Sequence, residues 1–120
     1  TLKAHLVGHV LVKGKAVTPL SVSGSLCVAK SAQDALRDFH DGEILVIQNT
    51  SNELLPLLKK ASGIITETEG TATHAAIVGM TLEIPVITGA QNATSILKSG
   101  TVVTIDGHRG LVYSGITKIV

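Results

Sequence analysis

The residues most able to do chemistry lie in one segment, 66–79, which reads TETEGTATHAAIVG. It places a single histidine, His74, where a loop rich in threonine and glycine gives way to a small-residue pattern typical of a helix. The first amide groups of a helix lack intrahelical acceptors, and the helix dipole adds positive potential at that end. We therefore predict that His74 stands beside donors that suit an oxyanion such as a phosphoryl group, phosphate or sulfate.

The chemistry expected of His74 is phosphoryl acceptance, because a neutral imidazole nitrogen is a nucleophile toward phosphorus. The dianion so formed needs donors, which the backbone of Gly70 and Ala75 and the hydroxyl groups of Thr71 and Thr73 offer. From spacing alone a plainer interpretation is favoured, in which Thr71 or Thr73 is an N-cap and His74 a polar residue in a first helical turn.

Other polar groups give weaker signals. No second histidine lies three or four residues from His74, and the histidines at 5, 9, 40 and 108 follow no ligand spacing, so we expect no metal in this domain. The segment 106–110, DGHRG, predicts a tight β-turn. Nothing in the sequence directs Arg109 toward a phosphate.

Bulk properties predict one domain, residues 1–120, that is a piece of a larger chain, since it begins at Thr1. The net charge of +1 and interspersed charges argue against nucleic acid and membrane surfaces as partners, and no apolar run is long enough to cross a bilayer. We interpret the single cysteine, Cys27, as a small buried apolar residue in a reducing, cytoplasmic protein.

The expected elements alternate between strand and helix after a β-rich start. Strands are predicted at 3–13, 21–30, 43–48, 62–66, 84–88, 101–106 and 111–113, and helices at 31–39, 50–60, 73–82 and 92–98. Ser31 is the expected N-cap of the first helix, which should bury Ala32, Ala35, Leu36 and Phe39, and Pro56 should kink or divide the second helix. The alternation from 43 to 106 predicts βαβ crossovers and a parallel sheet, with the first thirty residues forming or flanking a second β layer.

Three blocks, 63–67 (GIITE), 73–78 (THAAIV) and 84–89 (IPVITG), resemble the mobile phosphohistidine domain of enzymes that use phosphoenolpyruvate. Those enzymes include pyruvate phosphate dikinase, phosphoenolpyruvate synthase and enzyme I of the sugar phosphotransferase system. Ser23-Gly24 and the segment 106–115 resemble the start and end of that domain. More narrowly, 2–5 (LKAH), 91–97 (QNATSIL) and the ending are similar to the extra C-terminal domain of pyruvate kinases from bacilli and their relatives.

The resemblance implies an α/β fold, a swivelling β/β/α sandwich with a largely parallel sheet and an N-terminal β layer. It also implies a parent enzyme that transfers phosphate from phosphoenolpyruvate to ADP with Mg²⁺ and K⁺. The catalytic residues and cofactors of that kinase would lie outside this chain. The implied partners are the kinase core of the parent and neighbouring subunits of a homo-oligomer.

Three positions depart from the active phosphate carriers. Glu69-Gly70 replaces a glycine pair, Ala72 replaces a threonine, and Gly79-Met80 lacks the arginine that many carriers have there. Loss of a guanidinium removes a strong, bidentate phosphate partner. The leading interpretation is therefore a structural or regulatory C-terminal domain with a vestigial anion site at His74. A true phosphocarrier and a pure subunit-interaction module remain the alternatives.

Overall fold

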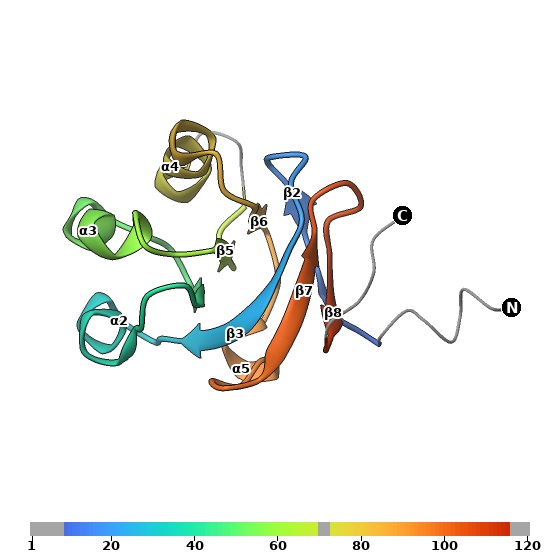
Figure 1. Cartoon of the computed structure of the whole chain (residues 1–120), viewed down its shortest axis with the longest axis horizontal. Coiled ribbons are helices and arrows are strands. Elements are labelled where there is room, and N and C mark those ends of the chain that lie inside the picture. Colours follow the sequence, from blue (N-terminus) through green and yellow to red (C-terminus); the bar gives the residue numbers. More distant parts are fainter. Residues whose placement is uncertain (1–8, 70–72, 116–120) are drawn as a thin grey trace, which may run out of the picture.

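Two β layers and one layer of helices make up the fold, as Figure 1 shows. The computed structural model describes residues 9–69 and 73–115. The predicted strand residues 3–8, and Gly70 and Thr71 of the predicted anion site, lie outside these ranges. The predicted β/β/α class is confirmed.

The order of elements follows the predicted alternation. The strands are β1 (Val10–Lys13), β2 (Lys15–Ala16), β3 (Val22–Val28), β4 (Ile44–Ile47), β5 (Gly63–Thr66), β6 (Val86–Thr88), β7 (Val102–Asp106) and β8 (Leu111–Ser114). The helices are α2 (Ala32–Asp38), the 3₁₀ helix η1 (Asn52–Leu54), α3 (Leu55–Leu58), α4 (His74–Leu82) and α5 (Ala93–Ile96).

The strands form one mixed sheet in the order β1-β8-β7-β3-β4-β5-β6-β2. The four strands β3 to β6 run parallel to one another, and the other pairings are antiparallel. Because β1 and β2 are neighbours in sequence yet pair with opposite ends of the sheet, the sheet curves back on itself. Gly14 N donates to Gly110 O at 2.8 Å and continues the β1–β8 pairing, whereas Val17 N donates to Val86 O at 2.9 Å and continues the β2–β6 pairing. The single residue Gly14 connects the two ends.

One predicted pairing is wrong. The alternation placed residues 101–106 as a further parallel strand, but β7 runs antiparallel to β3, with Val22 opposite Ile105. The outer edge of β6 is already occupied by β2, whose Lys15 lies opposite Thr88. With that edge filled, β7 pairs on the far side of β3 and contributes to the second β layer.

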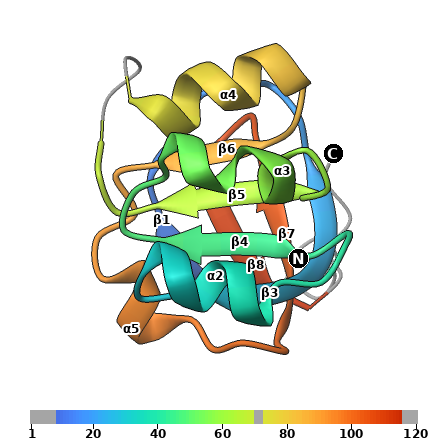
Figure 2. The ribbon, with the colours of Figure 1, turned by 90° about the vertical axis from the view of Figure 1, so that its left-hand side faces the viewer.

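Two apolar clusters fill the spaces between the layers. The cluster between the β layers includes Ile44, Val46 and Ile65, whereas the cluster under the helices includes Leu45 and Ile64. Successive side chains of a strand point to opposite faces, so β4 and β5, buried on both faces, supply both clusters. Figure 2 shows α2, α3 and α4 on one side of the sheet that contains β4, β5 and β6, running roughly along these strands.

The first two helices follow the prediction with corrections. Ser31 caps α2 by accepting from Asp34 N at 3.2 Å, but Leu36 is 51% exposed rather than buried with Ala35. The seven-residue helix packs on the sheet through Ala35, with Ala32 and Phe39 partly buried against the same cluster. The predicted helix at 50–60 is divided into η1 and α3, with Pro56 in the first turn of α3, where its missing N–H costs no helical hydrogen bond.

Candidate site at the start of helix α4

Helix α4 begins at His74, as the sequence predicts. Its N-cap is Thr73, whose backbone is extended and whose Oγ1 accepts from Ala76 N at 3.2 Å. Ile77 N donates to Thr73 O at 3.1 Å, so helical bonding starts there and the amides of His74 and Ala75 precede it. No acidic residue lies in the first turn. No carboxylate in the first turn therefore reduces the positive potential at the N-terminal end of α4.

Both ring nitrogens of His74 have neutral hydrogen-bond partners. Nδ1 lies 2.7 Å from Thr50 Oγ1, and Nε2 lies 2.9 Å from Asn52 Oδ1. An amide oxygen only accepts, so Nε2 donates to Asn52. In the neutral ring Nδ1 then accepts from the Thr50 hydroxyl. This arrangement specifies the Nε2–H tautomer.

The two partners differ in burial. Thr50 is only 5% exposed, and its backbone N–H donates to Asn49 Oδ1 at 2.9 Å, whereas Asn52 is exposed at the start of η1. The Nδ1 side of the ring therefore faces the protein interior and the Nε2 side faces an exposed residue. Ser51, the N-cap residue of η1, makes no side-chain capping bond.

The sheet brings these residues together. Strands β4 and β5 are parallel neighbours, with Ile47 opposite Thr66 at their carboxyl ends. Thr50 and Asn52 follow β4, and the segment after β5 leads to His74 at the start of α4. Because the two strands are parallel, Thr50, Asn52 and His74 all lie at the edge of the sheet where the carboxyl ends of the strands meet. Sequence reasoning missed the roles of Thr50 and Asn52. The available signal was the polar run 49–52, NTSN, directly after a buried strand.

The nearby glutamates that the structure describes are engaged elsewhere. Glu67 Oε2 accepts from Thr94 N at 2.9 Å and from Thr94 Oγ1 at 2.6 Å, at the start of α5. Glu69 is exposed and packs beside Gly89. The hydrogen bonds described for the His74 ring therefore involve no carboxylate.

Of the five predicted site residues, the described ones are Thr73, His74 and Ala75, and they are consecutive at the start of α4. Ala75 is fully buried, and Thr73 and His74 are partly exposed. Of these three residues, Thr73 and His74 are the ones with side chains open to solvent.

Helix α4 is seated on β6 through small residues. A Cβ atom added at Gly79 would collide with the side chain of Val86, so only glycine allows this approach. Ala75 and Val78 are buried on the same side, while Ile77 and Met80 remain about half exposed. This close seating fixes where the first turn of the helix, and hence His74, is placed.

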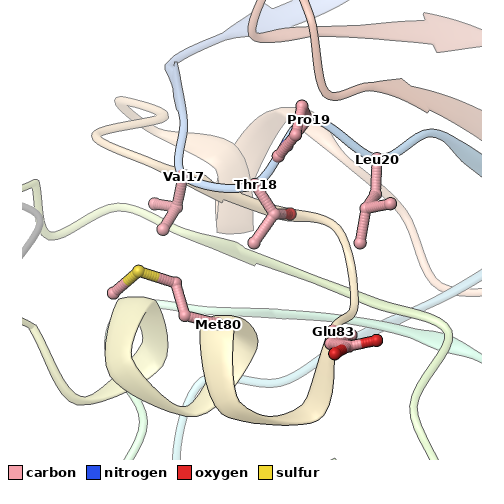
Figure 3. Close-up of a pocket in the computed structure, with 6 residues that line it drawn as sticks. All are labelled: Val17, Thr18, Pro19, Leu20, Met80 and Glu83. Atoms are coloured by element: carbon pink, nitrogen blue, oxygen red, sulfur yellow. The ribbon is translucent and has the colours of Figure 1, made fainter.

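A shallow groove of about 370 Å³ lies at the other end of α4 (Figure 3). Its lining comes from the segment between β2 and β3 and from the last turns of the helix: Val17, Thr18, Pro19, Leu20, Met80 and Glu83. Mostly apolar side chains and one carboxylate line it, and His74 does not take part. The groove therefore offers no chemistry to the histidine site.

The predicted turn at 106–110 holds a second polar cluster. Asp106 is fully buried and accepts from His108 N at 2.9 Å, from Arg109 N at 3.2 Å and from Arg109 Nη1 at 2.8 Å. Burial alone would raise the pKa of this carboxyl, but the hydrogen bonds from Arg109 and from the two amides outweigh it and lower the pKa. Arg109 is paired with Asp106 within the turn, where Gly110 has φ +72°.

Other candidate groups carry no further chemistry. Cys27 is buried as predicted, and burial, with the charges of Glu43 and Asp38, raises the pKa of its thiol to about 11. Among the described residues, no group of three or more His, Cys, Asp or Glu side chains is placed to bind a metal ion. Within the same ranges, no helix is long and apolar enough to cross a membrane.

Known proteins match this chain over nearly its whole length. The family model described as PEP-utilising enzyme, mobile domain, matches residues 39–110. A pyruvate kinase from Bacillus licheniformis is 44% identical over 95% of this chain and 20% of its own length. A phosphoenolpyruvate synthase from Aeropyrum pernix is 41% identical over 92% of this chain and 14% of its own length. The chain thus spans about a fifth of the pyruvate kinases that it matches, at their C-terminal part.

Solved structures support the fold. An NMR structure of Enzyme I superposes with a TM-score of 0.57 and 29% identity, over 67% of this chain and 33% of that chain. Aconitase X from Thermococcus kodakaraensis superposes with a TM-score of 0.67 over 88% of this chain and 98% of that chain, at 21% identity. The second likeness concerns the fold alone.

Proposed function

Because this chain belongs to the PEP-utilising enzyme, mobile domain family, we propose that it is the C-terminal domain of a pyruvate kinase-type enzyme, with a structural or regulatory role there. The match to the C-terminal part of bacterial pyruvate kinases over 95% of the chain supports this assignment. The parent would act in the cytoplasm and transfer phosphate from phosphoenolpyruvate to ADP. Its kinase core and neighbouring subunits would be the partners of this domain.

The Mg²⁺ and K⁺ ions of such a kinase would bind in the core of the parent. The described part of this domain offers no acidic or histidine cluster that fits them. We accordingly expect no pyruvate or ATP production from the 120-residue chain alone, with or without added Mg²⁺ and K⁺. A coupled turnover assay checks this, and turnover above the blank would contradict it.

The observation that carries the proposal is the hydrogen bonding of His74. In the neutral ring described above, Nε2 holds the proton and donates to Asn52, and the lone pair of Nδ1 faces the hydroxyl of the buried Thr50 at 2.7 Å. Neither nitrogen then offers an accessible lone pair to phosphorus. The ring instead connects α4 to the segment that follows β4.

The start of α4 is also a proposed oxyanion site, formed by Thr73, His74 and Ala75 together with Gly70 and Thr71. The helix dipole and the absence of acidic residues in the first turn favour an anion there. Titration with sulfate at constant ionic strength should shift the NMR amide signals of Thr73 and His74, whereas chloride should not. If the two salts act alike, there is no specific site.

The main test is a search for phosphohistidine. The chain is incubated with phosphoenolpyruvate and a phosphocarrier-type partner enzyme, and ³¹P NMR and peptide mass spectrometry are used to find acid-labile phosphate on residue 74. The proposal predicts no label on His74. Label that is present in the wild type and lost in His74→Ala would instead establish the carrier function.

That carrier function is the second candidate, and two observations favour it. The phosphoenolpyruvate synthase relative from Aeropyrum pernix is 41% identical over nearly the whole chain. The Nε2 side of His74 also faces an exposed residue rather than the core. If Asn52 moved aside, that nitrogen would become the reachable one.

A further inference from the structure

Asn52 stands where it decides the reactivity of His74. It is the first residue of η1, it is exposed, and its Oδ1 lies 2.9 Å from Nε2. The other nitrogen faces Thr50, which is nearly fully buried, so Nδ1 has no open approach. Within residues 9–69 and 73–115, the ring nitrogen on the solvent side is therefore Nε2, which Asn52 covers.

We propose that Asn52 is the specificity-determining residue of this site, holding His74 in the Nε2–H tautomer and thereby preventing it from accepting a phosphoryl group. This inference rests on the proposed function, because it gives a reason why the histidine of a phosphohistidine-type domain would not carry phosphate. Asn52 acts through His74, so it is a positioning residue and not a catalytic one.

The mechanism follows from what each partner can donate. Thr50 has a hydroxyl, which donates to Nδ1 or accepts from it equally well. Asn52 Oδ1 can only accept, so it alone requires the proton to be on Nε2. Without that oxygen the ring is able to place its proton on Nδ1, toward Thr50, and leave the lone pair of Nε2 facing solvent. That lone pair is the nucleophile a phosphoryl donor needs.

The test uses phosphoramidate, a small phosphoryl donor that needs no docking partner. The Nε2 lone pair forms the new N–P bond, and the P–N bond pair of the reagent, whose nitrogen is protonated, leaves with ammonia. The new bond makes the ring cationic, so Nδ1 then loses its proton to the released ammonia, which gives neutral phosphohistidine and ammonium. Labelling of each histidine is followed by peptide mass spectrometry, with the exposed His108 as the internal reference.

Asn52→Ala should increase the labelling rate of His74, relative to His108, by roughly fivefold, the factor expected for one net hydrogen bond. Asn52→Asp should lower the rate below that of the wild type, because a carboxylate still accepts from Nε2 and adds an attraction for the ring proton. Ser51→Ala is the matched control. The Ser51 hydroxyl donates to Glu53 at 3.2 Å and not to the ring, so the rate should not change.

The outcomes separate this inference from the proposed function. If wild-type His74 is unlabelled by phosphoenolpyruvate with the partner enzyme, and Asn52→Ala reacts with phosphoramidate no faster than the wild type, the role of Asn52 is wrong and the proposed function stands. If phosphoenolpyruvate and the partner enzyme label wild-type His74, the proposed function fails. Circular dichroism melts of each variant establish that it is folded, and Asn52→Gln provides a second variant that keeps the amide while displacing its oxygen.

Discussion

His74 and Asp106 are both polar groups beside buried strands, and the structure holds them differently. Asp106 is fully buried and accepts three hydrogen bonds, one of them from a cation. His74 is partly exposed and has two neutral side-chain partners, one buried and one at the surface. The Asp106 carboxylate has no side open to a ligand, whereas Nε2 of His74 would become open if the exposed side chain of Asn52 moved.

The comparison explains why only one of these sites is a candidate for chemistry. A charge that is buried and fully paired is costly to disturb, so the Asp106 turn is expected to stay as it is. A half-buried group held by neutral hydrogen bonds is held by roughly 1 kcal/mol per bond.

Replacing Asp106 should cost the most stability. Asp106→Ala removes the buried acceptor of the His108 and Arg109 amides and of the Arg109 guanidinium, at the end of a buried strand. We expect a loss of about 3 kcal/mol in the free energy of unfolding, measured by urea denaturation. The matched control is Asp41→Ala, whose carboxylate is exposed and 3.9 Å from Lys60, and its midpoint should equal that of the wild type. If Asp106→Ala and Asp41→Ala have equal urea midpoints, the buried Asp106 turn contributes no more stability than an exposed carboxylate, and this prediction is wrong.

Gly79→Ala should be destabilising even though alanine is the better helix former. The added Cβ meets the side chain of Val86 and pushes α4 away from β6. We expect a loss of about 2 kcal/mol from overpacking, together with shifted NMR signals for His74 and unshifted signals for Asp106. The neighbouring Met80→Ala, at an exposed position, serves as the control and should change stability little. A stabilised Gly79→Ala variant would show that α4 is not seated as described.

Thr50→Val should have a smaller effect. It keeps the buried volume but removes the hydroxyl that lies 2.7 Å from Nδ1 of His74. A loss of about 1 kcal/mol is expected, with an altered ring signal for His74 in NMR spectra. Thr50→Ser keeps the hydroxyl and should keep the ring signal of the wild type. If Thr50→Val and Thr50→Ser have the same stability and the same His74 ring signal, the hydrogen bond between Thr50 and Nδ1 contributes nothing measurable.

The stability that Asp106 contributes should change little with pH until the solution is strongly acidic. The pKa of Asp106 is lowered in the folded protein, so its ionised form contributes stability above the ordinary aspartate pKa of about 4, and this contribution is lost as the pH falls through the folded value. Urea midpoints of the wild type and of Asp106→Asn should therefore keep a constant difference from neutral pH to about pH 5. The difference should then narrow in more acidic solution. A difference that widens there would mean the opposite sign of the pKa shift.

The helix that carries His74 was predictable because its signals are local. Thr73 is a favoured N-cap residue, and the small residues that follow it fit a helix packed closely on a sheet. The strands β4 and β5 were equally clear as continuous apolar runs. These features depend on residues a few positions apart, which a sequence pattern can report.

The partners of His74 were not predictable in the same way. Thr50 and Asn52 lie more than twenty positions away, and they reach the ring only because β4 and β5 are parallel neighbours with aligned ends. The antiparallel pairing of β7 was missed for a related reason, since it depends on β2 already occupying the edge of β6. The exposure of Leu36 likewise depends on how α2 lies on the sheet.

The central claim is that His74 is held as the Nε2–H tautomer at the start of α4. Long-range ¹H–¹⁵N NMR of the histidine rings, at about pH 8, above the ordinary histidine pKa, measures this directly. The account predicts that in the wild-type chain His74 has one protonated and one unprotonated ring nitrogen, with the proton on Nε2. A proton on Nδ1, or the averaged signals of a ring that exchanges between both tautomers, would contradict it.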